Sequence, residues 1–331
     1  MRKKTLNTLL LILLSFIIKV NAGERKIIAY VTSWSNVKPD PFLMPHINYA
    51  FGHVSKNFNS VRIDNETRLK EIVSLKKINP KLKVLLSIGG WGSGNFSEMA
   101  ANPTLRLSFA RDCASKVKEF GLDGIDIDWE YPTSKEAGIS SSLDDTGNFT
   151  LLMKDIRNAI GKKKLLTLAT AAEPKYINLK SINPFINFVN IMTYDMASPP
   201  FHHAGLYKSN FTQNLSVEES IIKHFNAGIP YHKLVMGIPF YGRGTKEVGD
   251  FIDYRNIVNL KDYKRKWDNT SKAPYLVDTD NKFVCTYEDK ESIKLKCDLI
   301  KKMGLLGGMY WDYAGDTDNQ DLAKAVYNSL L

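Results

Sequence analysis

The chain has 331 residues, of which 45 are Lys or Arg and 35 are Asp or Glu, and its formal net charge is +10. The basic residues are scattered among acidic ones without an arginine-rich strip or a basic helix, so the charge does not indicate nucleic-acid binding. The three cysteines lack the spacing of a zinc site. We therefore expect no metal, no organic cofactor and no nucleic-acid partner, and we expect a monomer.

The N-terminal segment, residues 1–22, has the pattern of a secretory signal peptide. Basic residues at positions 2–4 precede an apolar run at 9–18, and small residues next to Ala22 offer a cleavage position. The apolar run is shorter than the roughly 20 residues that a membrane-spanning helix needs. An uncleaved anchor is the alternative. We expect cleavage near Ala22, secretion to the extracellular space or the periplasm, and no membrane association of the mature chain, 23–331.

Short apolar strands alternate with amphipathic helices along the rest of the chain. Most of the strands lack strict alternation of polar and apolar residues, which is typical of parallel strands buried on both faces. Eight strand–helix repeats predict a (β/α)8 barrel in a single domain. The expected strands are 26–31, 46–52, 83–87, 124–130, 165–169, 188–193, 234–240 and 306–311. The clearest helices are 66–77, 104–120, 147–160, 217–225, 290–303 and 318–330.

One interval, residues 244–289, breaks this rhythm between the seventh strand and its helix. Loops of this length without a function are uncommon, so we expect it to carry part of a site. Cys285 lies near its end and could pair with Cys297 in an oxidising compartment. Cys113 lies on a predicted helix and is expected to be a buried thiol.

The segment 123–130, Asp-Gly-Ile-Asp-Ile-Asp-Trp-Glu, places three carboxyls at every second residue of the fourth strand. The period of a strand puts Asp126, Asp128 and Glu130 on one face and the large apolar residues between them on the other. Crowded, desolvated carboxyls raise one another's pKa, and a carboxyl that stays protonated near neutral pH can act as a general acid. A solvated strand with acidic residues on its wet face is the alternative.

The barrel adds a geometric expectation, because catalytic groups of such folds gather at the C-terminal ends of the strands. Glu130 ends the fourth strand, Asp195 follows the sixth, Tyr241 and Arg243 follow the seventh, and Trp311 ends the eighth. Residues that are distant in sequence therefore converge at one rim.

The pattern D-x-x-D-x-D-x-E at 123–130 resembles the signature of the family 18 glycoside hydrolases, the chitinases and their relatives. The resemblance covers nearly the whole chain after the first two dozen residues. It includes Ser-Ile-Gly-Gly-Trp at 87–91, Met-Thr-Tyr-Asp at 192–195 and Tyr-Gly-Arg at 241–243. It implies that the interval 244–289 is a short α+β insertion forming one wall of the substrate cleft.

The resemblance also implies a retaining, substrate-assisted mechanism, in which the 2-acetamido oxygen of the substrate forms an oxazolinium ion. Glu130 is expected as general acid and base. Asp128 would accept the acetamido N–H, Asp126 would lie behind it and share its proton, and Tyr194 would donate to the acetamido oxygen. Asp123 has the wrong parity for this face and is expected to hold the start of the strand.

Further residues are assigned to substrate binding by the same resemblance. Trp311 would form the floor under the sugar at the cleavage site, and Met192 would also pack beneath that sugar. Asp195 would hydrogen-bond the substrate at the neighbouring subsite. Buried core Trp and structural Tyr residues are the alternatives for such isolated aromatics. Additional contacts are expected from Phe51, Trp91, Tyr241 and Arg243, whereas Trp34 could equally belong to the core. Residues expected to support the aspartates from behind are Tyr30, Ser87, Gly89 and Gly90.

Family members carry non-proline cis peptides at strand ends, which by resemblance makes Ala50–Phe51, Glu130–Tyr131 and Trp311–Asp312 candidates. The function implied is a secreted chitinase that cleaves β-1,4 bonds in chitin or N-acetylglucosamine oligosaccharides. An endo-β-N-acetylglucosaminidase acting on N-glycans and a non-catalytic chitin-binding lectin are the alternatives, although the lectins of the family typically lack the glutamate.

Overall fold

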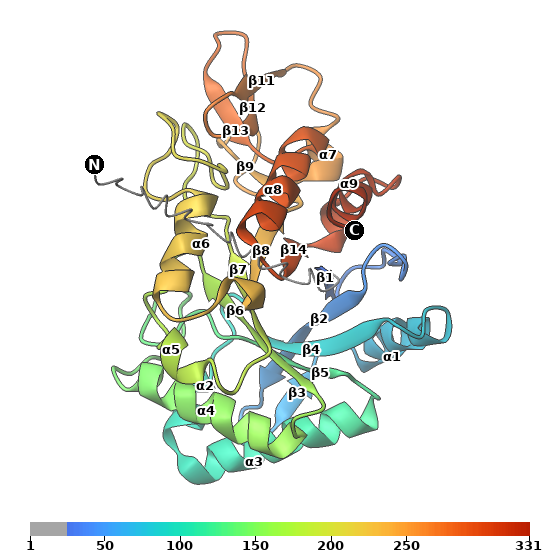
Figure 1. Cartoon of the computed structure of the whole chain (residues 1–331), viewed down its shortest axis with the longest axis vertical. Coiled ribbons are helices and arrows are strands. Elements are labelled where there is room, and N and C mark those ends of the chain that lie inside the picture. Colours follow the sequence, from blue (N-terminus) through green and yellow to red (C-terminus); the bar gives the residue numbers. More distant parts are fainter. Residues whose placement is uncertain (1–24) are drawn as a thin grey trace, which may run out of the picture.

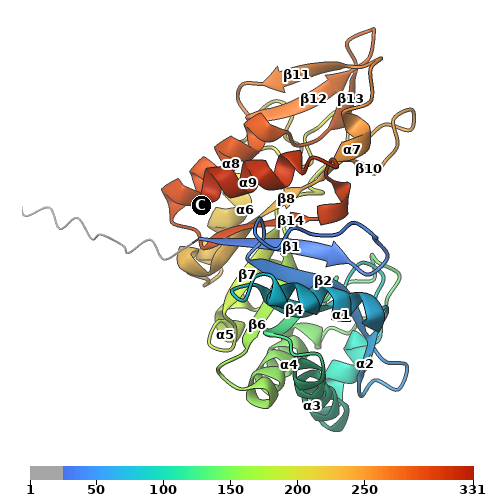
Figure 2. The same cartoon turned by 90° about the vertical axis from the view of Figure 1, so that its right-hand side faces the viewer.

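The computed structural model describes residues 25–331, so the predicted signal peptide lies outside the described part of the chain. Eight parallel strands form a barrel that closes where β1 pairs with both β2 and β14 (Figures 1 and 2). This confirms the predicted (β/α)8 fold. Around the barrel the strands are β1 (Lys26–Thr32), β14 (Gly307–Trp311), β8 (Leu234–Pro239), β7 (Phe188–Met192), β6 (Leu165–Ala171), β5 (Gly124–Asp128), β4 (Lys83–Gly89) and β2 (His46–Val54).

The six clearly predicted helices are all present. They are α1 (Glu66–Ser74), α3 (Pro103–Glu119), α4 (Asp145–Ile160), α6 (Val217–Asn226), α8 (Lys290–Met303) and α9 (Asp321–Leu330). Local chemistry fixes several of their starts, because a side-chain oxygen accepts an orphan N–H of the first turn. Asn65 caps α1, Asn102 caps α3, and Ser216 and Asp289 form capping boxes at α6 and α8.

Several short elements were not predicted. They are β3 (Val61–Ile63), which pairs with β2, the helices α2 (Phe96–Ala101) and α5 (Leu179–Ile182), and the 3-10 turns η2 (Tyr231–Lys233) and η3 (Tyr313–Gly315). The last three residues of the helix predicted for 66–77 form a further 3-10 turn, η1 (Leu75–Lys77). Such elements span too few residues to show a period in the sequence.

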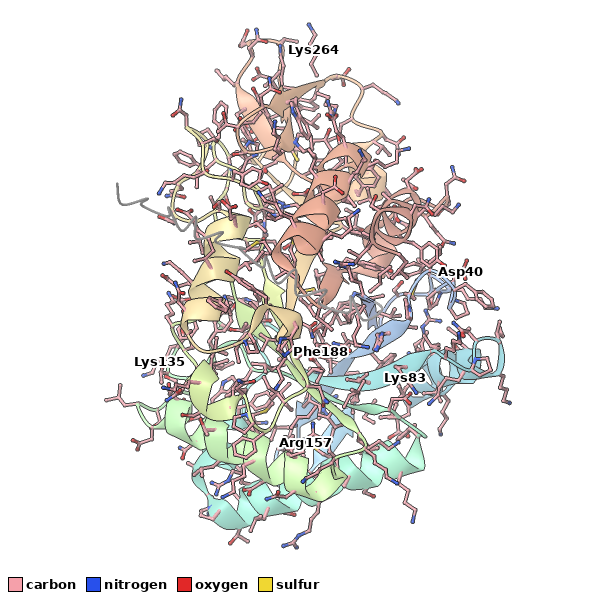
Figure 3. The ribbon with its side chains drawn as sticks, in the orientation of Figure 1. Asp40, Lys83, Lys135, Arg157, Phe188 and Lys264 are labelled. Carbon is pink, nitrogen blue, oxygen red and sulfur yellow. The ribbon has the colours of Figure 1, made fainter. Side chains whose placement is uncertain are left out.

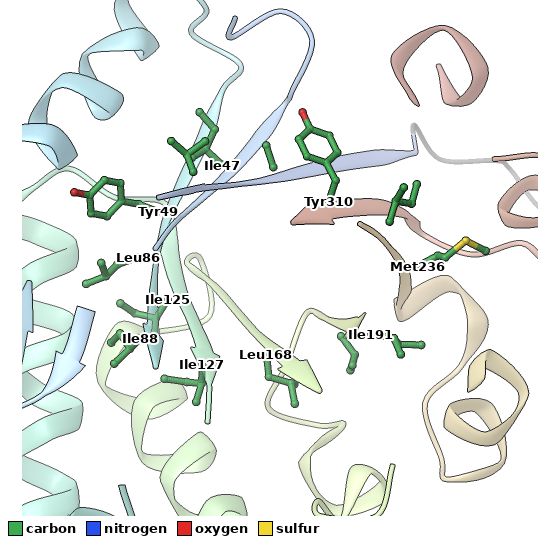
Figure 4. Close-up of a cluster of buried hydrophobic side chains, with 14 of the residues drawn as sticks. Ile47, Tyr49, Leu86, Ile88, Ile125, Ile127, Leu168, Ile191, Met236 and Tyr310 are labelled. Atoms are coloured by element: carbon green, nitrogen blue, oxygen red, sulfur yellow. The ribbon is translucent and has the colours of Figure 1, made fainter. Parts of the chain in front are cut away.

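The outer and inner faces of the barrel strands carry different kinds of side chain. On the outer face, Ile125 and Ile127 of β5 pack beside Leu86 and Ile88 of β4, under the surrounding helices (Figure 4). Burial of each such side chain contributes about 1.5–3 kcal/mol to stability. The inner face holds a smaller apolar cluster that includes Phe188, and this leaves room for the acidic groups of β5.

The predicted insertion is a five-stranded antiparallel sheet next to the barrel rim, at the top of Figure 1. Its strands are β9 (Tyr241–Gly244), β10 (Ile252–Asp253), β11 (Lys264–Asp268), β12 (Ala273–Val277) and β13 (Phe283–Thr286), with the helix α7 (Tyr254–Ile257) between β10 and β11. Lys264 marks its outer edge in Figure 3, far from Phe188 at the barrel centre. The sheet begins at Tyr241, three residues earlier than predicted, because β9 continues directly from β8.

The suggested Cys285–Cys297 pair is not formed. Both residues are free and buried, as is Cys113, so these thiols pack as small apolar groups. No helix in residues 25–331 has the length and apolar character needed to cross a membrane.

Candidate active site

A cleft of about 810 Å³ opens at the C-terminal ends of the barrel strands. It brings together most of the residues that the sequence assigns to catalysis and substrate binding. Its lining includes Phe51, Gly89, Gly90, Trp91, Asp128, Glu130, Met192, Tyr194, Asp195, Tyr241, Arg243 and Trp311, and also Trp34. A polar site therefore lies at the rim where the barrel topology predicts it.

Asp126 lies one step below this cleft, fully buried inside the barrel. Its Oδ2 accepts hydrogen bonds from Tyr30 Oη at 2.8 Å and Ser87 Oγ at 2.8 Å. Its Oδ1 accepts from Thr167 Oγ1 at 2.5 Å and Asn190 Nδ2 at 3.2 Å. Burial raises the pKa of Asp126, and these four donors oppose the shift. The four hydrogen bonds stabilise Asp126 as a carboxylate in the resting site.

Asp128 is almost as deeply buried, with 4% of its surface exposed, but its surroundings are different. Its Oδ1 has no hydrogen-bond partner within the described residues. Burial, and then the charges of Glu130 and Asp126, raise its pKa well above the usual value. We therefore assign to Asp128 the proton that the sequence predicts for the pair. The residue lines the cleft, and its unpaired Oδ1 is buried.

Glu130 is the outermost carboxyl of the row, two residues beyond the end of β5. Loss of hydration on burial raises its pKa to about 7, and the negative charge of Asp195 adds to the shift. A carboxyl with this pKa holds its proton near neutral pH and can release it without a large free-energy cost, as a general acid and base must.

Gly89 and Gly90 allow the backbone of β4 to approach this row. A Cβ at Gly89 would lie 1.9 Å from the carbonyl oxygen of Asp128, and one at Gly90 would lie 2.7 Å from the ring of Phe51. Both residues have positive φ angles, and the N–H of Gly90 donates to the carbonyl oxygen of Asp128 at 2.8 Å. The glycines thus fix the backbone that carries the central carboxyl.

A second group surrounds Asp195, just after β7. Tyr241 Oη donates to its Oδ2 at 2.8 Å and Arg243 Nε donates to its Oδ1 at 2.7 Å. Burial alone would raise the pKa of Asp195, but His203 and Arg243 outweigh it and hold that pKa below the usual range. The neighbouring Tyr194 is buried, and its hydroxyl lies 4.0 Å from the sulfur of Met309, a weak acceptor.

Aromatic rings form two groups along the cleft, and each group combines residues that are distant in the sequence. In the first, Trp311 stacks on Phe51 with ring centroids 5.6 Å apart, and Trp34 leans over both. In the second, Trp91 meets Tyr131 edge-on, and Tyr131 stacks on Tyr176 at 4.7 Å. Exposed ring faces of this kind suit the apolar faces of pyranose rings; Trp34 and Trp91 are both 64% exposed.

Asp123 is not brought to the cleft. Its carboxyl bonds Lys76 Nζ at 2.7 Å and the backbone N–H of Val84 at 3.0 Å, at the start of β5. The three non-proline cis peptides suggested by the resemblance, Ala50–Phe51, Glu130–Tyr131 and Trp311–Asp312, are all present.

The sequence analysis missed several residues of the site. Thr167 and Asn190 come from β6 and β7, and their inward parity was the available signal. His203 and Phe251 come from connections with no periodic pattern, so nothing local pointed to them. No group of three or more His, Cys, Asp or Glu within residues 25–331 is arranged to hold a metal ion.

The family of the chain follows from its sequence profile. The profile of glycosyl hydrolases family 18 matches residues 26–316. The chain belongs to family 18. This confirms the predicted membership and agrees with a row of carboxyls along the fourth strand of a barrel.

Individual family 18 relatives cover most of the chain. Chitinase A1 of Niallia circulans is 30% identical over 415 residues, which include 93% of this chain but only 58% of that protein. Chitotriosidase-1 of Mus musculus is 30% identical over 357 residues, covering 89% of this chain and 75% of the mouse protein. Among solved structures, a family 18 N-acetylglucosaminidase from Paenibacillus barengoltzii has a TM-score of 0.84 at 32% identity, over 93% of this chain and all of that one.

Proposed function

We propose that the chain is a secreted, retaining chitinase, which cleaves β-1,4 bonds between N-acetylglucosamine units with the help of the substrate's acetamido group. One observation carries this proposal. Asp128 presents a buried oxygen without a hydrogen-bond donor beside a Glu130 whose pKa is raised to about 7. The missing donor is what an acetamido N–H would supply, since an unpaired buried polar atom is costly.

In the first step, Glu130 gives its proton to the glycosidic oxygen, and the bond from that oxygen to the anomeric carbon breaks. The acetamido oxygen of the same sugar attacks the anomeric carbon, so that a positively charged oxazolinium ring forms. No side chain becomes covalently attached to the sugar. The departing chain leaves with the proton of Glu130, and Glu130 becomes a carboxylate.

Asp128 and Tyr194 would hold the acetamido group during this step. Asp128 accepts the acetamido N–H. As the positive ring forms, the proton of Asp128 moves to Asp126, where the hydroxyls of Tyr30 and Ser87 can turn to make room for it, and the negative charge left on Asp128 offsets the ring. Tyr194 turns its hydroxyl from the weak sulfur acceptor Met309 to the acetamido oxygen. These interactions strengthen as charge develops, which is the requirement for lowering the barrier and not only binding the substrate.

In the second step, the carboxylate of Glu130 removes a proton from a water molecule, whose oxygen attacks the anomeric carbon. The bond to the acetamido oxygen breaks, and the acetamido group is restored. Two displacements at the same carbon give a product with the original β configuration. Glu130 regains its proton and the cycle closes.

The substrate class is supported by the two aromatic groups of the cleft and by the names of the relatives. Trp311 and Trp91 lie in different aromatic groups of the same cleft, so each could stack on a different sugar unit of one chain. The N. circulans and mouse relatives are a chitinase and a chitotriosidase. We propose soluble N-acetylglucosamine oligomers and amorphous chitin as the substrates to test first.

Secretion is part of the proposal and rests on the basic and apolar pattern of residues 1–22. After expression of the full chain in a secreting host, the protein recovered from the culture medium should begin at the residue that follows Ala22. Edman or mass-spectrometric sequencing measures this directly. An unprocessed protein retained in the membrane fraction would instead support the anchor.

The test of the catalytic role compares the mature protein, Glu130→Gln, and a matched variant, Glu136→Gln. Glu136 is an exposed carboxyl of the same cleft that accepts a hydrogen bond from Tyr176 at 3.3 Å. Each protein is incubated with N-acetylglucosamine hexamer, and early products are separated by size and anomer. Glu130→Gln should lower the rate by about 10²–10⁴-fold, the range for a lost general acid, while Glu136→Gln remains active.

Initial β-anomers from the wild type and from Glu136→Gln alone support the proposal. Early α-anomers would contradict retention. Equal cleavage by Glu130→Gln would remove the role of Glu130. Absence of cleavage of the hexamer, with release of glycans from N-glycoproteins, would favour the endo-β-N-acetylglucosaminidase, and binding without cleavage of either would favour the lectin.

A further inference from the structure

Three donors from two different segments converge on the carboxylate of Asp195. Two of them, Tyr241 and Arg243, lie on β9 and were expected at the rim. The third is His203, eight residues beyond Asp195, whose Nδ1 lies 3.5 Å from Asp195 Oδ1. Asp195 itself has a φ of 56°, an uncommon conformation for a residue other than glycine.

The environment of His203 decides its protonation. The side chain is fully buried, and burial lowers its pKa, an effect opposed by the charge of Asp195. The charged groups Arg243 on β9 and Lys296 on α8 act in the same direction as burial, and the ring packs on Tyr241 at 5.4 Å. Because Asp195 is an acceptor, a neutral His203 must carry its hydrogen on Nδ1. Its Nε2 is buried without a partner.

The insertion and α8 hold the backbone around this imidazole. The N–H of His203 donates to Thr286 Oγ1 of β13 at 3.3 Å, and the ring of the preceding His202 contacts the same hydroxyl. On the following residue, the carbonyl oxygen of Ala204 accepts from Lys296 Nζ at 2.5 Å. Lys296 is itself buried and pairs with Glu288 at 3.2 Å.

Three consecutive residues are thus fixed from outside the barrel. A buried imidazole with one unpaired nitrogen is a costly core residue, and its remaining nitrogen is directed at Asp195. We propose that His203 is a positioning residue of the site: held by the insertion and α8, it donates from Nδ1 to Asp195 and fixes that carboxylate as an acceptor for the sugar. This inference rests on the proposed function for the identity of the sugar, but the His203–Asp195 contact does not.

If His203 positions Asp195, the insertion does more than form a wall of the cleft, because it also orients a side chain of the site. It carries two donors to Asp195 directly, on β9, and anchors the third through β13. Asp195 binds substrate in both the ground state and the transition state, so loss of its orientation should act mainly on KM.

The experiment replaces His203 in two ways. His203→Leu removes the donor and keeps much of the volume, whereas His203→Asn places an amide N–H at the position of Nδ1. The matched control is His224→Leu on α6, another fully buried histidine with an unpaired Nε2, whose Nδ1 contacts the carbonyl oxygen of Ser220. Kinetics with N-acetylglucosamine oligomers are measured from pH 4 to 8.

His203→Leu should raise KM about three- to tenfold, the loss of one hydrogen bond, with kcat changed less than about twofold. Loss of this donor raises the pKa of Asp195, so 1/KM of His203→Leu should fall at the acidic end of this range, where 1/KM of the wild type stays level. The alkaline limb of kcat/KM, which belongs to Glu130, should stay in place. His203→Asn should restore KM, and His224→Leu should leave it unchanged.

An unchanged KM in His203→Leu would overturn the role, as would a failure of His203→Asn to improve on it. If His203→Leu does not fold, His203→Gln serves instead, since its amide lies near the Nε2 position and cannot reach Asp195. It should behave like a protein without the donor.

A substrate-free measurement separates this inference from the proposed function. Nitrogen NMR of the histidine side chains, with His203 identified by its absence in His203→Asn, should show a neutral ring protonated on Nδ1 that shifts in Asp195→Asn. A ring protonated on Nε2 would overturn the inference. Lack of activity of the wild type with the expected NMR result would overturn only the proposed function.

Discussion

The interior of the barrel and its open rim hold carboxyls in opposite ways. Asp126 and Asp128 are two residues apart on the same face of β5, and both are buried. Asp126 has four donors around two oxygens, whereas one oxygen of Asp128 has none among the described residues. The satisfied carboxyl belongs to the protein alone. The unsatisfied one is complete only when something else enters the cleft, which marks the boundary between scaffold and site.

The contrast between the two carboxyls predicts the largest loss of activity for a substitution of Asp128, at the rim. Asp128→Asn keeps the shape but cannot develop negative charge beside the oxazolinium ring. Activity on N-acetylglucosamine oligomers should fall by about 10²–10³-fold, the range for loss of one electrostatic stabiliser. Stability should stay nearly unchanged, because the wild-type carboxyl is already protonated. Steady-state kinetics measure the activity and thermal melting of the same samples measures the stability. A clear loss of stability would contradict the view that Asp128 belongs to the site and not to the scaffold.

The next effect belongs to the interior. Asp126→Asn puts an NH2 group where two donors already point, so at least one donor loses its acceptor. The free energy of unfolding should fall by about 1.5–3 kcal/mol, the value of hydrogen bonds to a charged group. Urea denaturation measures it. An Asp126→Asn protein as stable as the wild type would mean that the four hydrogen bonds to Asp126 do not stabilise the fold.

The two carboxyls also differ in how far the sequence could predict them. Their placement on one face follows from the period of a strand, which is a local property of residues 123–130, and it was predicted correctly. The reason for their difference is not local. Thr167 and Asn190, which bond Asp126, become its neighbours only through the pairing of β5, β6 and β7, and no spacing along the chain reveals that register.

The same distinction explains the rest of the fold. The barrel strands and long helices were predicted to within about three residues at each end, because each carries its own period of apolar residues. The insertion was predicted as an interruption, but its five strands were not. His203 was missed because its role depends on contacts with Thr286 and Lys296, more than 80 residues away.

The pH dependence of activity sharpens the comparison at the outermost carboxyl. Glu130 must hold its proton to protonate the leaving oxygen, and its pKa is raised to about 7. The value of kcat/KM should therefore be high below pH 7 and fall about tenfold per pH unit above it. Asp195→Asn removes a negative charge that raises this pKa, so the alkaline limb should move to lower pH. A limb that stays in place would show that burial alone sets the pKa of Glu130.

The smallest changes in stability and activity are expected when a single hydrogen-bond donor to Asp126 is removed. Ser87→Ala removes one of the two bonds to Asp126 Oδ2, and Ser97→Ala removes an equivalent bond, 2.7 Å long, from a buried serine to Asp145 away from the cleft. Each should lower the free energy of unfolding by about 1 kcal/mol. Only Ser87→Ala should change catalysis, by a fewfold, because an Asp126 carboxylate with one donor fewer is more basic and competes with Asp128 for the proton. Equal kinetics in both variants would mean that the carboxylate inside the barrel supports the fold without tuning the carboxyl above it.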